Sequence, residues 1–297
     1  MTPFFIALQF LTRLKIVNQT EWSVDDFGKS VVAFPYVGLI IGLILALLYG
    51  ILSPFIPLVP LMLIIVIAEF LITGGLHADG LMDTSDGLFS GRERERKLEI
   101  MKDSRIGSFG VVAFVFVTLL KWQLLTAIPT SEFIPMALIM MPLMSRWSLV
   151  LSIRSYPYAR KEGMGAAFAN LAPKHVITYN TISTFFMPIV ILLIGVILYT
   201  LLYGVYSIFS IADVGYVVGL GVLVYATLGI FQINIVSMII TYIINRILNH
   251  YIVKQLGGTT GDTYGFVVEV TEVLLLLIYI IILSVLSASV ASNTMMF

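Results

Sequence analysis

Gly74-Gly-Leu-His-Ala-Asp-Gly-Leu-Met-Asp-Thr-Ser-Asp-Gly87 follows directly on residues 54–73, an apolar segment long enough to cross a bilayer. Its aspartates, Asp79, Asp83 and Asp86, are spaced i, i+4 and i+7, so on a helix they fall within roughly 60° of one another. Carboxylates on one face repel each other unless a cation lies among them. Oxygen ligands suit Mg²⁺, which commonly bridges protein carboxylates to substrate phosphates. The stretch predicts a magnesium site for phosphate chemistry at a membrane surface.

The composition is that of a polytopic membrane protein. Of the 297 residues, 59% are hydrophobic and 11% are charged, against about 45–50% and about 25% in soluble domains. Basic and acidic residues are equal at 17 each, so net charge gives no indication of a nucleic-acid partner, and we expect none. Cysteine is absent, which excludes disulfides, zinc–thiolate sites and thiol nucleophiles. No linker divides the chain, and we expect one membrane-embedded domain over residues 1–297.

The predicted fold class is an all-α bundle of about seven transmembrane helices with short interfacial helices, the first near Met1–Leu14. The predicted spans are residues 31–52, 54–73, 110–128, 133–151, 181–206, 214–241 and 264–290.

The connections between these spans alternate in charge. All 17 basic residues except Lys121 and Arg146 lie before residue 31 or within 74–109, 152–180 and 242–263. The positive-inside rule therefore places these segments, and the aspartate stretch with them, on the cytoplasmic side of the cell membrane. The N-terminus is expected inside and the C-terminus outside.

Four ionisable side chains near this stretch have more than one interpretation. Glu69 lies one or two turns below it in the preceding span and is a candidate further ligand. His77 is either hydrogen-bonded to backbone or catalytic. Arg146 lies deep in a predicted span, where charge is costly, and this favours a functional or paired role. Lys121 either pairs in the same way or extends its amine to the membrane surface.

A basic segment follows the aspartates. In its first half, residues 92–99, glutamates alternate with the basic residues, which favours a solvated face. In its second half, Lys102, Asp103 and Arg105 lie close to the next span. Basic groups beside a carboxylate–metal site suit a diphosphate, since arginine holds phosphate oxygens bidentately. Arg146 and Arg160 are further candidates for the same task.

A second acidic cluster opens the last predicted span. Asp262 lies in the glycine- and threonine-rich loop 257–265, and Glu269 and Glu272 follow it. Helix capping explains the loop but does not explain two glutamates inside an apolar span. We expect this cluster on the same membrane face as the aspartates. Together with Glu69 it is a candidate second metal site or the opposite wall of one cleft.

Several of these stretches resemble the cobalamin synthase (adenosylcobinamide-GDP ribazoletransferase) family over nearly the whole chain. The stretches are Gly74–Gly87, Leu98–Gly107, Gly258–Asp262 with Glu269 and Glu272, Phe10–Leu14, Phe34-Pro35 with Gly38, and Tyr156–Arg160. The region near 175–215 is longer than the family pattern leads us to expect.

The resemblance implies a Mg²⁺-dependent integral membrane transferase. Its substrates are adenosylcobinamide-GDP and α-ribazole or α-ribazole 5′-phosphate, and its products are adenosylcobalamin or its 5′-phosphate, and GMP. A ribose hydroxyl attacks the cobinamide-side phosphorus, a step that mainly needs positioning and charge neutralisation. Asp83, Asp86 and His77 remain alternatives for the group that accepts the hydroxyl proton.

Two other functions were weighed against this one. A CDP-alcohol phosphotransferase also carries spaced aspartates under a span, but that family has Ala-Arg after the first Asp-Gly and a fourth aspartate further on, and this sequence has neither. A cation-coupled transporter predicts acids near mid-span and inverted repeats, whereas most acids here lie at the cytoplasmic end. A homo-oligomer and a complex with other cobalamin-pathway enzymes are both compatible with the sequence.

Overall fold

The structure is a computed structural model that describes residues 3–18, 23–160, 163–207 and 214–294, and these residues form helices without a strand. This confirms the predicted all-α class. The helices are α1 (Pro3–Leu11), α2 (Val24–Ser30), η1 (Val31–Ala33), α3 (Phe34–Leu52), α4 (Leu58–Thr73), α5 (Leu76–Phe89), α6 (Arg94–Ile100), α7 (Ser108–Thr126), η2 (Ser131–Phe133), α8 (Ile134–Ser155), α9 (Met164–Leu171), α10 (Val176–Ser207), α11 (Val214–Leu256) and α12 (Gly261–Thr294).

The membrane-spanning pattern also follows the prediction. Within the described ranges, six helices are long and apolar enough to cross a membrane, and α4 with α5 forms a bent seventh candidate. The main difference is α11, which continues as helix to Leu256 through much of the predicted connection 242–263. Residues 208–213, part of the expected connection after the fifth span, lie outside the described residues.

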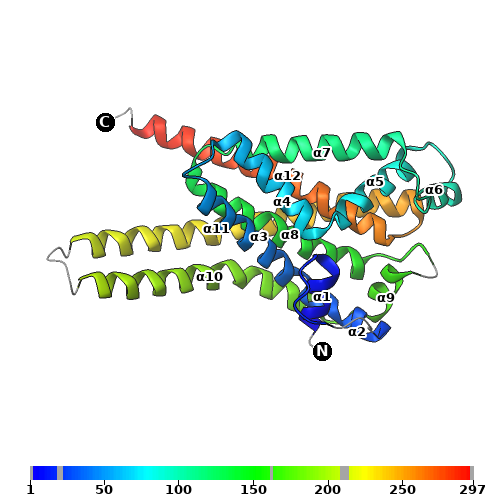
Figure 1. Ribbon diagram of the computed structural model, residues 1–297, viewed down its shortest axis with the longest axis horizontal. Helices are drawn as coiled ribbons and strands as arrows, with labels where there is room; N and C mark the ends of the chain where they lie inside the picture. The colour runs from blue at the N-terminus through cyan, green and yellow to red at the C-terminus, as the bar shows by residue number, and fades with distance from the viewer. Residues whose placement is uncertain (1–2, 19–22, 161–162, 208–213, 295–297) are drawn as a thin grey trace.

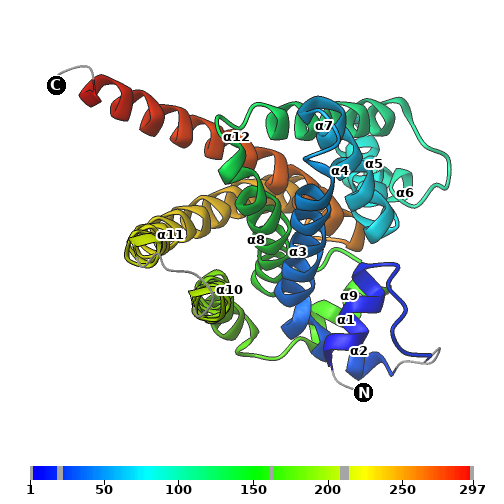
Figure 2. The same ribbon diagram turned by 60° about the vertical axis from the view of Figure 1, so that its left-hand side comes forward.

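The segments rich in basic residues gather at one end of the molecule. Figure 1 shows α5, α6 and α9 at this end, with α1 and α2 close by. At the opposite end of the molecule lie the C-terminal ends of α10 and α12 and the N-terminal end of α11. Seen from the second direction, α3 and α8 run side by side through the middle (Figure 2).

Two glycines create the bend between α4 and α5. Gly74 and Gly75 have φ angles of +65° and +73°, a left-handed conformation that glycine adopts without steric cost. The Gly75 N–H donates to the Phe70 carbonyl at 3.0 Å and closes the end of α4. The chain then turns by 90°, so the polar helix α5 leaves the end of the span instead of continuing it.

Helices α3 and α8 form the centre of the core through glycine contacts. A Cβ on Gly38 would lie 2.2 Å from the Pro142 carbonyl oxygen, and one on Gly42 would lie 2.6 Å from the Ile139 Cα. Small residues of this kind let two backbones approach closely in a membrane. Nearly all of α8 is buried as a result.

Gly42→Val should force α3 and α8 apart and lower the free energy of unfolding by about 1–3 kcal/mol, the usual cost of overpacking a core. Gly50→Val, on the same helix, is the matched control because a Cβ there has nothing within 4 Å. Thermal unfolding of the purified protein in detergent measures both. Equal midpoints for the two variants would contradict the proposed contact.

Candidate active site

Helix α5 carries the three aspartates on one helix, as the sequence indicates, and their burial increases along it. Asp79 is exposed, Asp83 is half-buried and Asp86 is buried. The helix packs tightly on the start of α12. A Cβ on Gly80 would lie 2.5 Å from the Asp262 carbonyl oxygen, and one on Gly265 would lie 2.7 Å from the His77 carbonyl oxygen. The missing side chains therefore allow α5 and α12 to meet backbone to backbone.

This contact brings Asp262 next to the α5 aspartates. Burial, and then the nearby charges of Asp79, Asp262 and Asp86, raise the pKa of the Asp83 carboxyl to about 7, and the charge of Arg160 opposes this rise. The Arg160 Nη2 lies 2.9 Å from the Asp262 Oδ2. We call Asp79, Asp83 and Asp262 the aspartate site.

A short backbone bridge holds Arg160 in place. The Ala159 N–H donates to the Thr259 carbonyl at 2.8 Å, and the Thr259 N–H donates to the Pro157 carbonyl at 2.8 Å. Gly258 is required here, because a Cβ on it would lie 2.7 Å from the Ala159 nitrogen. The loop after α8 is thereby fixed to the loop before α12, and the guanidinium reaches the aspartate site.

Asp86 has a different set of partners. Its Oδ2 accepts a hydrogen bond from the Gly107 N–H at 2.8 Å, and its Oδ1 accepts one from the Gly110 N–H at 2.9 Å. These donors belong to the first turn of α7, where backbone N–H groups lack helical partners. Asp86 therefore anchors the start of α7, and with it the loop 101–107, to α5.

The predicted phosphate ligands of this loop are exposed. Lys102, Asp103 and Arg105 all face solvent. Arg105 donates to Asp103 through Nε at 3.1 Å and Nη2 at 2.8 Å. This pairing lowers the pKa of the Asp103 carboxyl to about 2. Arg105 can reach a phosphate by leaving its surface partner, since exposed ion pairs contribute little.

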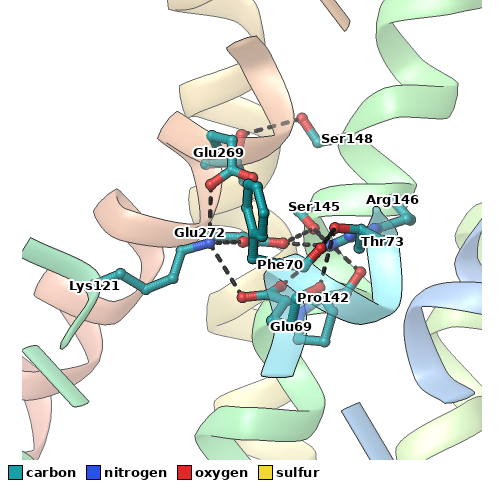
Figure 3. A network of polar contacts seen from close by, with 11 residues as sticks. Glu69, Phe70, Thr73, Lys121, Pro142, Ser145, Arg146, Ser148, Glu269 and Glu272 are labelled. Atoms are coloured by element: carbon teal, nitrogen blue, oxygen red, sulfur yellow. Dashed lines mark hydrogen bonds and ion pairs between the residues drawn. The ribbon is translucent and has the colours of Figure 1, made fainter. Parts of the chain in front are cut away.

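Three of the predicted acidic site residues, Glu69, Glu269 and Glu272, form a buried ion-pair network with two basic residues (Figure 3). The Lys121 Nζ lies 3.2 Å from Glu69, 2.9 Å from Glu269 and 2.5 Å from Glu272. Arg146 bonds the second oxygen of Glu272 and lies 3.8 Å from Glu69. The network joins α4, α7, α8 and α12.

This network sets the environment of four predicted site residues. Glu69, Glu269 and Glu272 have cationic partners from the chain itself, which is how buried charges are normally compensated. Arg146 is 1% exposed and engaged by Glu272, so it does not face an open site. Depth in an apolar span was the signal for the pairing of Arg146 and for one of the two interpretations of Lys121, but the sequence did not show that both cations share Glu272.

The aspartate site offers oxygen ligands without forming a closed cage. In the part of the chain that the structure describes, no three acidic or histidine side chains converge as a complete metal site. Mg²⁺ commonly takes only one or two protein carboxylates and completes its shell with water and substrate phosphates. Asp79 and Asp83, one turn apart and beside Asp262, fit that type of site.

His77 lies on α5 next to the aspartate site. It is 3% exposed, and neither ring nitrogen has a hydrogen-bond partner among the residues that the structure describes. It lines a cavity together with Asp79 and Asp262. The aromatic residues around this cavity come from separate helices, so the sequence pattern that indicated His77 did not reveal them.

The cobalamin-5-phosphate synthase family model matches residues 3–280. The chain belongs to this family. Adenosylcobinamide-GDP ribazoletransferase of Desulfitobacterium hafniense is 35% identical over 93% of this chain and 96% of its own length. The protein of the same name from Fusobacterium nucleatum is 35% identical over 95% and 98%, respectively. No solved structure matches the chain. Family membership makes the chain a membrane transferase of cobalamin biosynthesis.

Lys121→Met should remove the central cation of the buried ion-pair network and lower the free energy of unfolding by about 3–5 kcal/mol, because uncompensated carboxylates remain buried. The double variant Lys121→Met/Glu269→Gln should recover part of this loss, since it restores the net charge of the network. Lys29→Met removes an exposed pair with Asp25 and is the control. Chemical denaturation in detergent measures the free energy of unfolding of all three variants. If Lys121→Met is as stable as Lys29→Met, the role given to Lys121 is refuted.

Proposed function

We propose that this chain is an adenosylcobinamide-GDP ribazoletransferase, which joins α-ribazole or its 5′-phosphate to adenosylcobinamide-GDP and releases GMP. The observation that carries the proposal is the aspartate site, where Asp79, Asp83 and Asp262 lie with Arg160 at one end of the bundle. Transfer from a diphosphate needs carboxylates that hold a metal ion and a basic side chain that binds phosphate. The aspartate site with its neighbour Arg160 offers both kinds of residue. The names of the full-length relatives agree with this reaction.

Mg²⁺ is the cofactor that the aspartate site suits best. Asp79 and Asp83 would hold it, with Asp262 close by, and Asp86 would fix the helix that carries them. When bound, the ion neutralises diphosphate oxygens and the charge that develops on the departing phosphate. The spacing predicts Asp86 as a third metal ligand, and this stays a prediction. Both oxygens of Asp86 accept hydrogen bonds from backbone N–H groups.

The basic residues proposed to bind phosphate form two groups that differ in position. Arg160 is part-buried at the aspartate site and contacts the diphosphate. Lys102 and Arg105, on the loop fixed by Asp86, close over the leaving GMP phosphate from solvent. The ribose hydroxyl oxygen forms a bond to the cobinamide-side phosphorus, and the bond from that phosphorus to the GMP oxygen breaks with its electron pair. In this scheme Asp83 accepts the hydroxyl proton, because burial and the neighbouring carboxylates raise the pKa of its carboxyl to about 7.

The site is proposed to face the cytoplasm. The basic segments gather at the same end of the bundle as α5 (Figure 1), which is the pattern of a cytoplasmic face. Corrinoid and nucleotide substrates are polar and would reach the aspartate site from that side, while the spans remain in the lipid.

Asp83→Asn should abolish GMP release while the protein stays folded, because the neutral amide holds a cation more weakly than the carboxylate and cannot accept the proton. Glu99→Gln is the control, since Glu99 forms an exposed pair with Arg96 at the same end. The assay follows GMP from purified protein, Mg²⁺, adenosylcobinamide-GDP and α-ribazole 5′-phosphate. Full activity of Asp83→Asn would overturn the assignment.

Chelation tests the metal separately. EDTA should stop GMP release, and Mg²⁺ added back should restore it without a change in thermal stability, since the spans do not depend on the ion. Undiminished turnover in EDTA would show that Asp79 and Asp83 act without a cation.

Arg160→Gln should reduce transfer by at least tenfold, the cost of losing one charge-assisted contact to phosphate. Arg154→Gln on the same segment is the matched control because its side chain is exposed. Steady-state kinetics with varied adenosylcobinamide-GDP compare the two variants. Identical values of kcat and KM for Arg160→Gln and Arg154→Gln would exclude Arg160 from the site.

A further inference from the structure

A cavity of about 210 Å³ lies beside the aspartate site, and the mechanism above leaves it without a task. Its walls come from α1, α3, α5, α8, α9 and α12. Most of the lining is apolar, and none of the lining residues that the structure describes is a lysine or an arginine. The carboxylates of Asp79 and Asp262, which belong to this lining, repel phosphates, so the cavity suits an uncharged group with one or few polar atoms.

Aromatic rings form one wall of this cavity. The rings of Phe10 and Phe34 are nearly parallel, at 17° and 6.4 Å between centroids. Phe168 packs against both, at 5.0 Å from Phe10 and 5.4 Å from Phe34. Tyr264 of α12 also lines the cavity. Aromatic rings arranged in this way provide stacking and edge contacts for a planar ring.

His77 supplies the polar group that a ligand would satisfy. Its imidazole is 3% exposed, and within the described part of the chain neither nitrogen has a hydrogen-bond partner. A buried donor or acceptor without a partner loses its hydrogen bonds to water and gains none in return, and native structures rarely leave one without a reason. An occupant with a single ring-nitrogen acceptor would pair with the imidazole N–H.

We propose that this cavity binds the benzimidazole base of the ribazole substrate, an inference that rests on the proposed function. The base is planar and mostly apolar, and once attached to ribose it has one unsubstituted ring nitrogen, for which His77 is the donor. Guanine fits poorly, because its carbonyl, amino and ring N–H groups would need several partners that an apolar lining lacks. The corrin macrocycle is too large for the cavity.

The position of the cavity explains how the nucleophile would reach the phosphorus. Asp79 and Asp262 belong both to the cavity lining and to the aspartate site. With its base between Phe168 and His77, the riboside projects its ribose toward these carboxylates. The base-binding cavity and the diphosphate site therefore adjoin along α5 and α12, and the substrates approach each other there.

Phe168→Leu tests the aromatic wall through kinetics. It should raise KM for α-ribazole 5′-phosphate by roughly tenfold, in line with the loss of aromatic contact, and leave KM for adenosylcobinamide-GDP unchanged. Phe185→Leu is the control, since Phe185 packs with Phe186 and Phe231 elsewhere in the bundle. A rise in KM for adenosylcobinamide-GDP instead would assign the cavity to guanine and overturn the proposal.

His77 is tested with a substrate that lacks its partner atom. The wild-type enzyme should prefer the benzimidazole riboside over the otherwise matched indole riboside, which has C–H in place of the ring nitrogen, by about tenfold in kcat/KM. In His77→Leu this ratio should fall to about one. A ratio that persists in the variant would overturn the role of His77, and Phe168→Leu remains the test should His77→Leu fail to fold.

These outcomes are separate from failure of the proposed function. If the wild-type protein releases no GMP with either riboside, the transferase assignment itself fails. If wild type is active and both variants behave like Phe185→Leu, the reaction stands and the base binds elsewhere.

Discussion

The buried ion-pair network constrains the rest of the structure. Five charged side chains from four helices lie in the apolar interior, with Lys121 at the centre of three glutamates. Taking such charges out of water costs several kcal/mol for each ion, and only close pairing offsets it. The relative positions of α4, α7, α8 and α12 are therefore fixed within narrow limits. Because α5 begins at the end of α4 and packs on both α7 and α12, these limits also set where its aspartates lie.

The structure divides the acidic residues into two groups with different surroundings. Glu69, Glu269 and Glu272 are neutralised inside the bundle by cations of the chain. Asp79, Asp83 and Asp262 lie where α5 meets the start of α12, with Arg160 as their cationic neighbour. The glycine bend after α4 produces this division, because it moves the aspartates out of the span while Glu69 stays within it. We assign stability to the first group and phosphate chemistry to the second.

Much of the fold follows from the sequence, since span length and charge asymmetry are local properties. The seven predicted spans correspond to helices, and Gly74-Gly75 marked the break before α5. The site could be predicted only in part. Asp79 and Asp83 share a helix face by spacing, but Asp262 joins them through the contact of Gly80 and Gly265, which no spacing reveals. Spacing also did not show that Asp86 accepts hydrogen bonds from the start of α7, or that Lys121 and Arg146 belong to one network. Nor did it show that aromatic residues of separate helices line one cavity with His77.

The location of a bound cation tests this division most directly. Crystals of the enzyme grown with Mn²⁺ in place of Mg²⁺ and with adenosylcobinamide-GDP would show the ion by its anomalous scattering. The account predicts one ion beside Asp79 and Asp83, with a phosphate oxygen completing its coordination and Lys121 still bonded to its three glutamates. An ion among Glu69, Glu269 and Glu272, with Lys121 displaced, would contradict it.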